Sequence, residues 1–236
     1  MPIFQFDSKL VYYAHIPKTA GTTIGKLLCQ AGAKQHFVAS LAHRAPKKTR
    51  LVNLPPQHIT TEHFEALFDP SGFAGVFAFL RHPEDRMISE YRFRHARGGI
   101  HAKLSFTDWV WFTVAAYEHF PYLLEGHILP QHQFLIPRTK TFKLEDGFDP
   151  FFEWVGETFG IDIRQNGGVE RYNASNDCDV RLTRESRTLI NAFYRKDFEA
   201  LGYAPREVSD LPSDKIGLGK KPFLKSLGGI YALARQ

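Results

Sequence analysis

The sequence predicts an α/β protein built as a three-layer α/β/α sandwich around a central parallel sheet. Two observations lead to this prediction. Strand patterns alternate with helix patterns along most of the 236 residues. In addition, Val76–Leu80 is an unbroken apolar run, as in a parallel strand that is covered on both faces. Ligands in such folds bind beyond the carboxyl ends of the strands, so the loops that follow strands are the first candidates for a site.

The first strand–loop–helix unit begins with Lys9–Ile16, which is rich in β-branched and aromatic residues. The loop Pro17–Gly21 follows it. The helix after the loop carries an apolar stripe and ends near Gly32. We expect Thr22 or Thr23 to cap this helix.

The second unit is the apolar run that ends at Arg81, followed by another helix. Pro83 suits the first position of a helix. Glu84 and Asp85 put negative charge in its first turn, where the helix dipole favours it. The sequence therefore predicts a strand end and a helix start only two residues apart.

Weaker patterns predict the remaining elements. We expect short strands at 35–39, 50–54 and 141–144, and helices at 61–68, 149–159 and 183–201. Another helix should begin at Ser105, which forms a capping box with Asp108. Residues 161–182 are rich in Asn, Gly, Asp and Arg and should form a loop.

The length predicts one domain, at residues 1–203. The prolines, the Gly-Leu-Gly turn and the lysines after Tyr203 predict a basic C-terminal tail at 204–236 with at most one short helix. The formal net charge of +5 suggests an anionic partner. The excess is small and no nucleic-acid-binding motif accompanies it, so we do not expect a nucleic acid. Oligomeric state is not predicted.

Cys29 and Cys178 match no disulfide framework or metal motif. The longest apolar runs, 72–80 and 109–117, are shorter than the roughly 20 residues that span a bilayer. The N-terminus lacks the layout of a signal peptide. We therefore expect a cytoplasmic protein with no transmembrane segment.

The stretch His15–Thr23, HIPKTAGTT, combines a small flexible loop, a lysine and hydroxyls at a helix N-terminus. Backbone N–H groups can surround an oxyanion there. The loop is not a Walker A loop, because its lysine precedes its glycine. We predict a phosphate or sulfate cradle. The alternative is an ordinary turn with a solvent-exposed Lys18.

A second anion site is predicted after the second strand. Arg81 stands at the strand end, and Arg86 and Ser89 lie three residues apart on one helix face. These groups could offer a guanidinium fork and a hydroxyl to a phosphate monoester. The alternative is that both arginines pair with neighbouring carboxylates on the surface.

Taken together, HIPKTAGTT and the later LRHPEDRMISEY resemble the paired donor-binding signatures of carbohydrate sulfotransferases. They look most like the group that includes the heparan sulfate 2-O-sulfotransferases and related bacterial proteins. The resemblance implies a P-loop-like sulfotransferase fold. It also implies 3′-phosphoadenosine 5′-phosphosulfate (PAPS) as the sulfuryl donor, 3′-phosphoadenosine 5′-phosphate (PAP) as the product and no metal.

In that family the first loop holds the 5′-phosphosulfate, a role that would fall to Lys18, Thr19, Ala20, Gly21, Thr22 and Thr23. The Arg and Ser eight residues apart hold the 3′-phosphate, which implies Arg81 and Ser89. Two further segments extend the resemblance. Arg171–Asn176 resembles a loop that closes near the cofactor and acceptor, and Asp197–Tyr203 resembles the family's closing helix.

The predicted general base is His58. The segment QHITTEHF resembles the family segment whose His is the base, although Gln57 stands where the family has Gly. His132 and His63 are the alternative bases. The spacing of His58 and His63 does not put two ligands on one helical face, so no metal site is expected.

The expected reaction is transfer of the sulfuryl group from PAPS to a hydroxyl of an acceptor, with a carbohydrate as the expected class. Lys18 would balance charge on the leaving oxygen, and His58 would take the acceptor proton. Two alternatives remain. One is a nucleotide-dependent kinase, and the other is a non-catalytic relative that binds a polyanion through Arg92, Arg94, Arg97 and Lys103.

Overall fold

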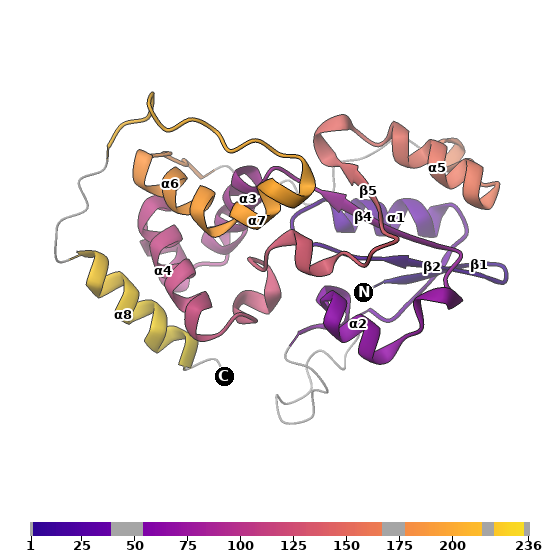
Figure 1. The fold of residues 1–236 in the computed structure, drawn as a ribbon, viewed down its shortest axis with the longest axis horizontal. Helices are drawn as coiled ribbons and strands as arrows, with labels where there is room; N and C mark the ends of the chain where they lie inside the picture. The colour runs from indigo at the N-terminus through magenta and orange to yellow at the C-terminus, as the bar shows by residue number, and fades with distance from the viewer. Residues whose placement is uncertain (1, 39–53, 167–177, 214–219, 234–236) are drawn as a thin grey trace. The chain divides into compact units, whose positions relative to one another are not determined.

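The computed structural model describes residues 2–38, 54–166, 178–213 and 220–233. The chain forms two compact units, each assembled from two stretches of sequence. Unit 1 contains residues 1–81 and 133–174, and unit 2 contains residues 82–132 and 175–236. The fold is a mixed α/β fold, with the sheet in unit 1 and most of the helices in unit 2 (Figure 1).

Unit 1 is built on a five-stranded sheet with the strand order β3-β1-β2-β4-β5. The strands are β1 (Ile3–Phe6), β2 (Lys9–Tyr13), β3 (Lys34–His36), β4 (Gly75–Leu80) and β5 (Lys140–Lys143). β2, β4 and β5 are parallel, whereas β1 is antiparallel to both β2 and β3. The prediction of a parallel sheet is therefore wrong for β1, which is antiparallel to both of its neighbours. A two-residue connection from β1 to β2 permits only antiparallel pairing.

Helices contact both faces of this sheet. Strand residues alternate between the faces, so Val11 and Tyr13 point to one side and Tyr12 to the other. The first side packs against α1 (Gly21–Gln30) and α5 (Asp149–Phe159) in an aromatic core. On the second side Tyr12 stacks on Phe64 of α2, with ring centroids 4.1 Å apart. Because α2 (Thr61–Leu67) has only seven residues, a full three-layer sandwich stays a prediction.

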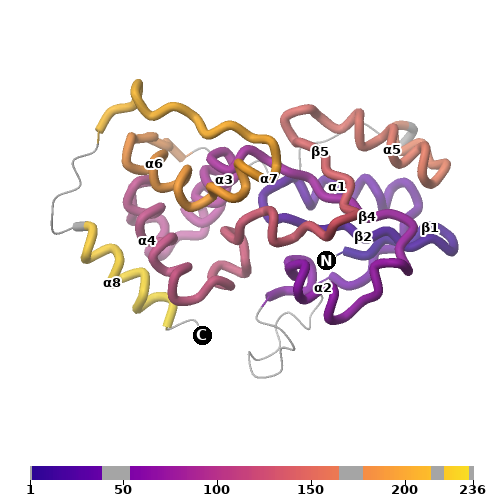
Figure 2. The backbone as a smooth tube through the Cα atoms, in the orientation of Figure 1, coloured from indigo at the N-terminus to yellow at the C-terminus, as the bar shows by residue number. Residues whose placement is uncertain are grey.

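Unit 2 is helical. Its helices are α3 (Pro83–Ala96), α4 (Phe106–His119), α6 (Arg184–Phe193), α7 (Arg195–Leu201) and α8 (Lys220–Leu233). Figure 2 follows the chain as it leaves unit 1 after β4, forms α3 and α4, and returns for β5 and α5 before the last three helices. Short 3₁₀ turns lie at Pro56–His58, Pro70–Gly72, Gly99–Lys103, Leu123–Gly126, Gln131–Phe134, Leu144–Asp146 and Ile163–Asn166.

Most predicted elements are confirmed within one or two residues, and Ser105 caps α4 by accepting a hydrogen bond from the N–H of Asp108 at 3.2 Å. The single helix predicted at 183–201 is in fact two helices that meet at Tyr194. The Tyr194 ring is buried, and its hydroxyl donates a hydrogen bond to the carbonyl of Ile128 at 3.0 Å. This tertiary contact fixes the residue at which the helix breaks.

Three predictions fall partly or wholly on residues outside the described ranges. They are the strand at 50–54, the loop at 161–182 and the closing loop at Arg171–Asn176. The boundary between a domain at 1–203 and a tail at 204–236 also stays a prediction. No helix in the part of the chain that the structure describes is long and apolar enough to cross a membrane.

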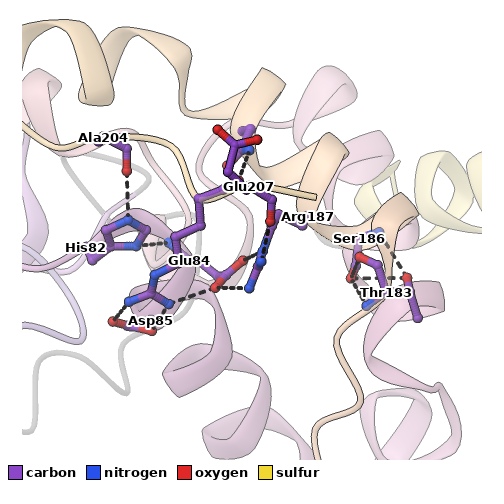
Figure 3. A network of polar contacts seen from close by, with 10 residues as sticks. His82, Glu84, Asp85, Thr183, Ser186, Arg187, Ala204 and Glu207 are labelled. Atoms are coloured by element: carbon purple, nitrogen blue, oxygen red, sulfur yellow. Dashed lines mark hydrogen bonds and ion pairs between the residues drawn. The ribbon is translucent and has the colours of Figure 1, made fainter. Parts of the chain in front are cut away.

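Ion pairs hold the start of α3 within unit 2 (Figure 3). Glu84 is fully buried, and its carboxylate accepts hydrogen bonds from Arg187 at 2.6 and 3.1 Å and from Arg206 at 2.7 Å. Asp85 binds the same Arg206 guanidinium through two contacts of 2.7 Å. Hydrogen bonds to Asp85 and Glu84 raise the pKa of Arg206 above its ordinary value, so this guanidinium stays charged. α3, α6 and the segment around residue 206 are thereby tied together.

A second buried group of charges lies further along α3. Glu90 is 1% exposed, and its carboxylate accepts a hydrogen bond from Arg94 Nε at 2.6 Å and lies 2.7 Å from His127 Nδ1. Burial alone would raise the pKa of Glu90. The His127 and Arg94 charges beside it outweigh burial and lower the pKa to about 2. Glu90 is therefore a buried anion at neutral pH.

Replacing Glu90 by Gln should lower the free energy of unfolding by about 3–5 kcal/mol at neutral pH, because the largely buried Arg94 loses its counter-charge and His127 loses its carboxylate partner. The pKa of Glu90 in the fold lies below the ordinary 4.5. The difference in free energy of unfolding between the parent protein and the variant should therefore be largest above that value. It should shrink as the pH falls from about 4.5 toward 2. Urea unfolding of both proteins at neutral and acidic pH measures this.

The matched control is Glu199→Gln, which removes the exposed pair between Arg195 and Glu199. It should change the free energy of unfolding by less than about 1 kcal/mol. A loss in Glu90→Gln that does not change with pH would contradict the interpretation of Glu90 as a paired anion.

Candidate functional site

The predicted anion loop connects β2 to α1 in unit 1. Strand pairing continues past the end of β2, because the N–H of Ala14 donates to the carbonyl of Phe77 at 2.8 Å. Ile16, at the start of the loop, is fully buried and anchors the loop in the core. The loop thus leaves the carboxyl end of a central strand, which is where ligands bind in open α/β sheets.

The loop has an unusual backbone. Lys18 and Ala20 have φ values of 70° and 65°, in the left-handed region that residues other than glycine rarely adopt. Each such residue costs about 1–3 kcal/mol unless its surroundings enforce it. Between them Thr19 is fully buried, and its hydroxyl donates to the carbonyl of Ile16 at 2.8 Å. The side chain of Thr19 therefore holds the loop in shape, and only its backbone N–H can serve a ligand.

The first turn of α1 offers hydrogen-bond donors. The helix begins at Gly21 with Ala20 at the N-cap, and its first bond runs from the N–H of Ile24 to the carbonyl of Ala20 at 3.1 Å. The N–H groups of Gly21, Thr22 and Thr23 consequently have no acceptor within the helix. The predicted capping by Thr22 or Thr23 is wrong, because both lie inside the helix. The helix dipole adds positive potential here, so an anion would be stabilised.

Gly21 has a steric role. A Cβ atom at this position would lie 1.8 Å from Nε2 of His15, so either the His15 ring or the helix start would have to move. His15 in turn stacks on Tyr13, with ring centroids 5.2 Å apart. The His15 ring is thus packed directly against the first residue of α1, and this contact sets the position of the helix start relative to β2.

Arg81 reaches the same loop. It follows β4 directly, and β4 is the parallel neighbour of β2, so both strands end at the same edge of the sheet. Its Nη1 donates a long hydrogen bond of 3.4 Å to the carbonyl of Lys18. The two predicted features of unit 1, the lysine loop and the strand-end arginine, are therefore brought together.

The other predicted members of the second anion site lie in unit 2. Ser89 is a half-buried residue of α3, and its pairing with Arg81 stays a prediction. Arg86 is 1% exposed, and its guanidinium donates to the carbonyls of His127 and Leu129 and to the hydroxyl of Tyr194. The Arg86 guanidinium therefore binds groups in the interior of unit 2. The suggested phosphate contact of Arg86 is wrong, and the suggested surface ion pair of Arg86 is also wrong.

The predicted base, His58, lies beside the loop in unit 1. It ends a 3₁₀ turn that is stabilised by a hydrogen bond from its N–H to the carbonyl of Pro55 at 2.9 Å. Its ring meets the His15 ring edge-on, with centroids 5.2 Å apart. His58 is a buried residue, 6% exposed. His63, the nearby alternative, accepts or donates a 2.7 Å hydrogen bond with Thr60.

A pocket of about 330 Å³ opens beside the loop. His15, Gly21 and Thr22 line it on the loop side, and Lys26 and Gln57 are among the other lining residues. Gln57 directly precedes the predicted base. The pocket therefore joins the start of α1 to the 3₁₀ turn that carries His58, all within unit 1.

His132, the second alternative base, has a partner that the sequence did not reveal. Its Nδ1 lies 2.7 Å from Oδ1 of Asp197, which is fully buried and also accepts hydrogen bonds from the N–H groups of Gln131 and His132. The His132 side chain is 27% exposed. A buried carboxylate that fixes one ring nitrogen of an accessible imidazole is the arrangement of an oriented general base. Because 65 residues separate the partners, no local pattern could have paired them.

The comparisons with known proteins are consistent with this geometry. A family model described as the sulfotransferase family matches residues 1–204, which include every predicted site residue. Neither a comparison with curated proteins nor one with solved structures found a match. Among the described residues, no group of three or more His, Cys, Asp or Glu side chains could hold a metal ion.

Changing Gly21 to Ala should destabilise unit 1, because the new methyl group would overlap His15. Overpacking of this kind costs about 1–3 kcal/mol. Gly25→Ala is the matched control, since a Cβ there would have only ordinary contacts of 3.5 Å to Gln35 and 3.9 Å to Phe4. Denaturant unfolding should show a lower free energy of unfolding for Gly21→Ala. The free energy of unfolding of Gly25→Ala should be unchanged or higher. Equal stability of the two variants would mean that His15 does not fix the helix start.

Proposed function

This chain belongs to the sulfotransferase family, and on that premise we propose that it transfers the sulfuryl group of PAPS to a hydroxyl of a carbohydrate acceptor. The single observation that best supports the proposal is the convergence on one sheet edge of the left-handed loop at Lys18, the N-terminus of α1 and the guanidinium of Arg81. These groups offer positive charge and N–H donors to one anionic ligand.

The residues of the loop fit a phosphosulfate group. The left-handed backbone at Lys18 and Ala20 is costly without a function, and such strain is concentrated at ligand-binding sites. The amides of Gly21, Thr22 and Thr23 can donate to sulfate and phosphate oxygens. In this proposal Arg81 binds the 3′-phosphate. PAPS supplies the sulfuryl group and leaves as PAP.

In the proposed mechanism Lys18 supplies positive charge where the leaving phosphate oxygen becomes more negative. The amides at the start of α1 stabilise the same charge without rearrangement, because the loop is already held by Thr19 and His15. A histidine accepts the proton of the acceptor hydroxyl as the oxygen attacks sulfur. Loop and base together orient the reacting atoms, which is a large part of catalysis in group transfer of this kind.

We assign the base to His58, which lies in the same unit as the loop and next to the pocket-lining Gln57. The edge-on contact with His15 fixes the position of the His58 ring. The pocket beside α1 is then the proposed entrance for the acceptor, since it is lined by residues of both the loop and the 3₁₀ turn. Its volume of about 330 Å³ suits a small group such as a sugar unit.

PAP should raise the melting temperature of this protein, because a ligand at a hundred times its Kd adds about 2.7 kcal/mol to the free energy of unfolding. Arg81→Ala should weaken PAP binding about tenfold or more, since a hydrogen bond to a charged group contributes about 1.5–3 kcal/mol. Calorimetric titration with PAP measures the affinity.

The matched control is Arg164→Ala, which removes a half-exposed arginine of unit 1 whose guanidinium lies 3.6 and 3.7 Å from two carboxylates and over the Phe152 ring. It should leave PAP affinity unchanged. Stabilisation by ATP but not by PAP would contradict the proposal and favour a kinase. Stabilisation by heparin without PAP would favour a polyanion-binding protein.

His58→Ala should lower turnover with PAPS and a carbohydrate acceptor by about a hundredfold or more while PAP affinity is retained. The rate of the parent enzyme should fall on acidification, because the base must be neutral to accept a proton. Steady-state rates across a pH series measure both effects. His132→Ala is the comparison, since its imidazole is the one held by a buried carboxylate. If His132→Ala loses the activity and His58→Ala keeps it, the assignment of the base is reversed.

A further inference from the structure

Helix α8 lies beyond the matched part of the chain. The family match ends at residue 204, whereas α8 spans Lys220–Leu233 in unit 2. Nothing in the proposed reaction uses this helix. Its two faces differ sharply in their surroundings, and the difference points to a second surface on the molecule.

The inner face of α8 is packed closely against α4, beside which it runs in Figure 1. A Cβ on Gly228 would lie 2.5 Å from the carbonyl oxygen of Phe112, so only glycine permits this approach. The hydroxyl of Tyr231 lies 3.2 Å from Nε2 of His101, whose Nδ1 accepts a hydrogen bond of 3.0 Å from the indole of Trp109. The helix is therefore held in one orientation.

The outer face of α8 is apolar and open to solvent. Phe223, Ile230 and Leu233 are 61%, 65% and 64% exposed, more than any other large apolar side chain of the described residues. Their spacing of seven and three residues puts them on one face of the helix. A contiguous exposed apolar stripe is a common feature of interaction surfaces.

The charge of this region favours an anionic partner. Residues 215–236 contain five cations, Lys215, Lys220, Lys221, Lys225 and Arg235, and no Asp or Glu. These five equal the formal net charge of +5 of the whole chain, so residues 1–214 carry no net charge. Lys221 and Lys225 lie over the ring of Trp111, 5.0 and 6.0 Å from its centroid, away from the apolar stripe.

We propose that α8 docks its outer face on the surface of an anionic phospholipid membrane. An exposed Phe, Ile and Leu face combined with lysines on the remainder of the helix is the pattern of an interfacial helix. Each Lys or Arg near an anionic leaflet adds about 1 kcal/mol of attraction. Fourteen residues rise only about 21 Å, so the helix lies in the interface and does not cross it. A second copy of the chain is a poorer partner, because it would bring together two segments that each carry five cations and no anion.

The test is sedimentation of the full chain with two kinds of vesicle, phosphatidylcholine alone and an equal mixture of phosphatidylcholine and phosphatidylglycerol. The parent protein should bind the mixed vesicles, bind the neutral ones much less, and be released by salt. The triple variant Phe223→Ser, Ile230→Ser, Leu233→Ser should lose about tenfold or more of the affinity. Because all three side chains are exposed, the variant should keep its melting temperature.

The matched control is Leu67→Ser, which removes an apolar side chain that is 52% exposed in unit 1. It should bind vesicles like the parent protein. Equal binding of parent and triple variant would overturn the proposal, and so would no binding of the parent to the mixed vesicles. A parent dimer in light scattering that the triple variant converts to monomer, without vesicle binding, would assign the surface to a second copy instead.

Discussion

The parallel pairing of β2 with β4 is the constraint on which the candidate site depends. It places Tyr13 opposite Phe77 and continues through the hydrogen bond from Ala14 to the Phe77 carbonyl. Because both strands run in the same direction, the loop that follows β2 and the arginine that follows β4 emerge at one edge. An antiparallel pair, like β1 with β2, would send them to opposite edges.

The charged side chains of this molecule fall into two groups that differ in burial. Glu84, Arg86 and Glu90 are each 1% exposed or less and make several hydrogen bonds inside unit 2. Such groups specify how the helices fit together, because a buried charge that loses its partner is severely penalised. Lys18 and Arg81, by contrast, are only half-buried at the open edge of the sheet. They remain accessible to a ligand, which is consistent with the proposed donor site.

The fold elements were largely predictable because their signals are local. Apolar periodicity, Pro83 at a helix start and the Ser105 cap each depend on a few neighbouring residues, and the structure confirms these elements. The errors arose where distant residues decide the outcome. The helix break at Tyr194 depends on the hydrogen bonds of Tyr194 with Ile128 and Arg86. The antiparallel strand β1 was not predicted from the sequence.

For the candidate site, the sequence by itself determined which chemical groups are present and the family: a loop with lysine, hydroxyls and glycine before a helix, an arginine after an apolar run, and a match to the sulfotransferase family. Only the tertiary structure decided which of these groups are buried, accessible or paired. It buried Arg86, turned the side chain of Thr19 inward, packed His15 against Gly21 and paired His132 with Asp197. The physical reason is that a motif fixes which groups lie close along the chain. Burial and hydrogen-bond partners depend on residues tens of positions away, which become neighbours only once the chain has folded.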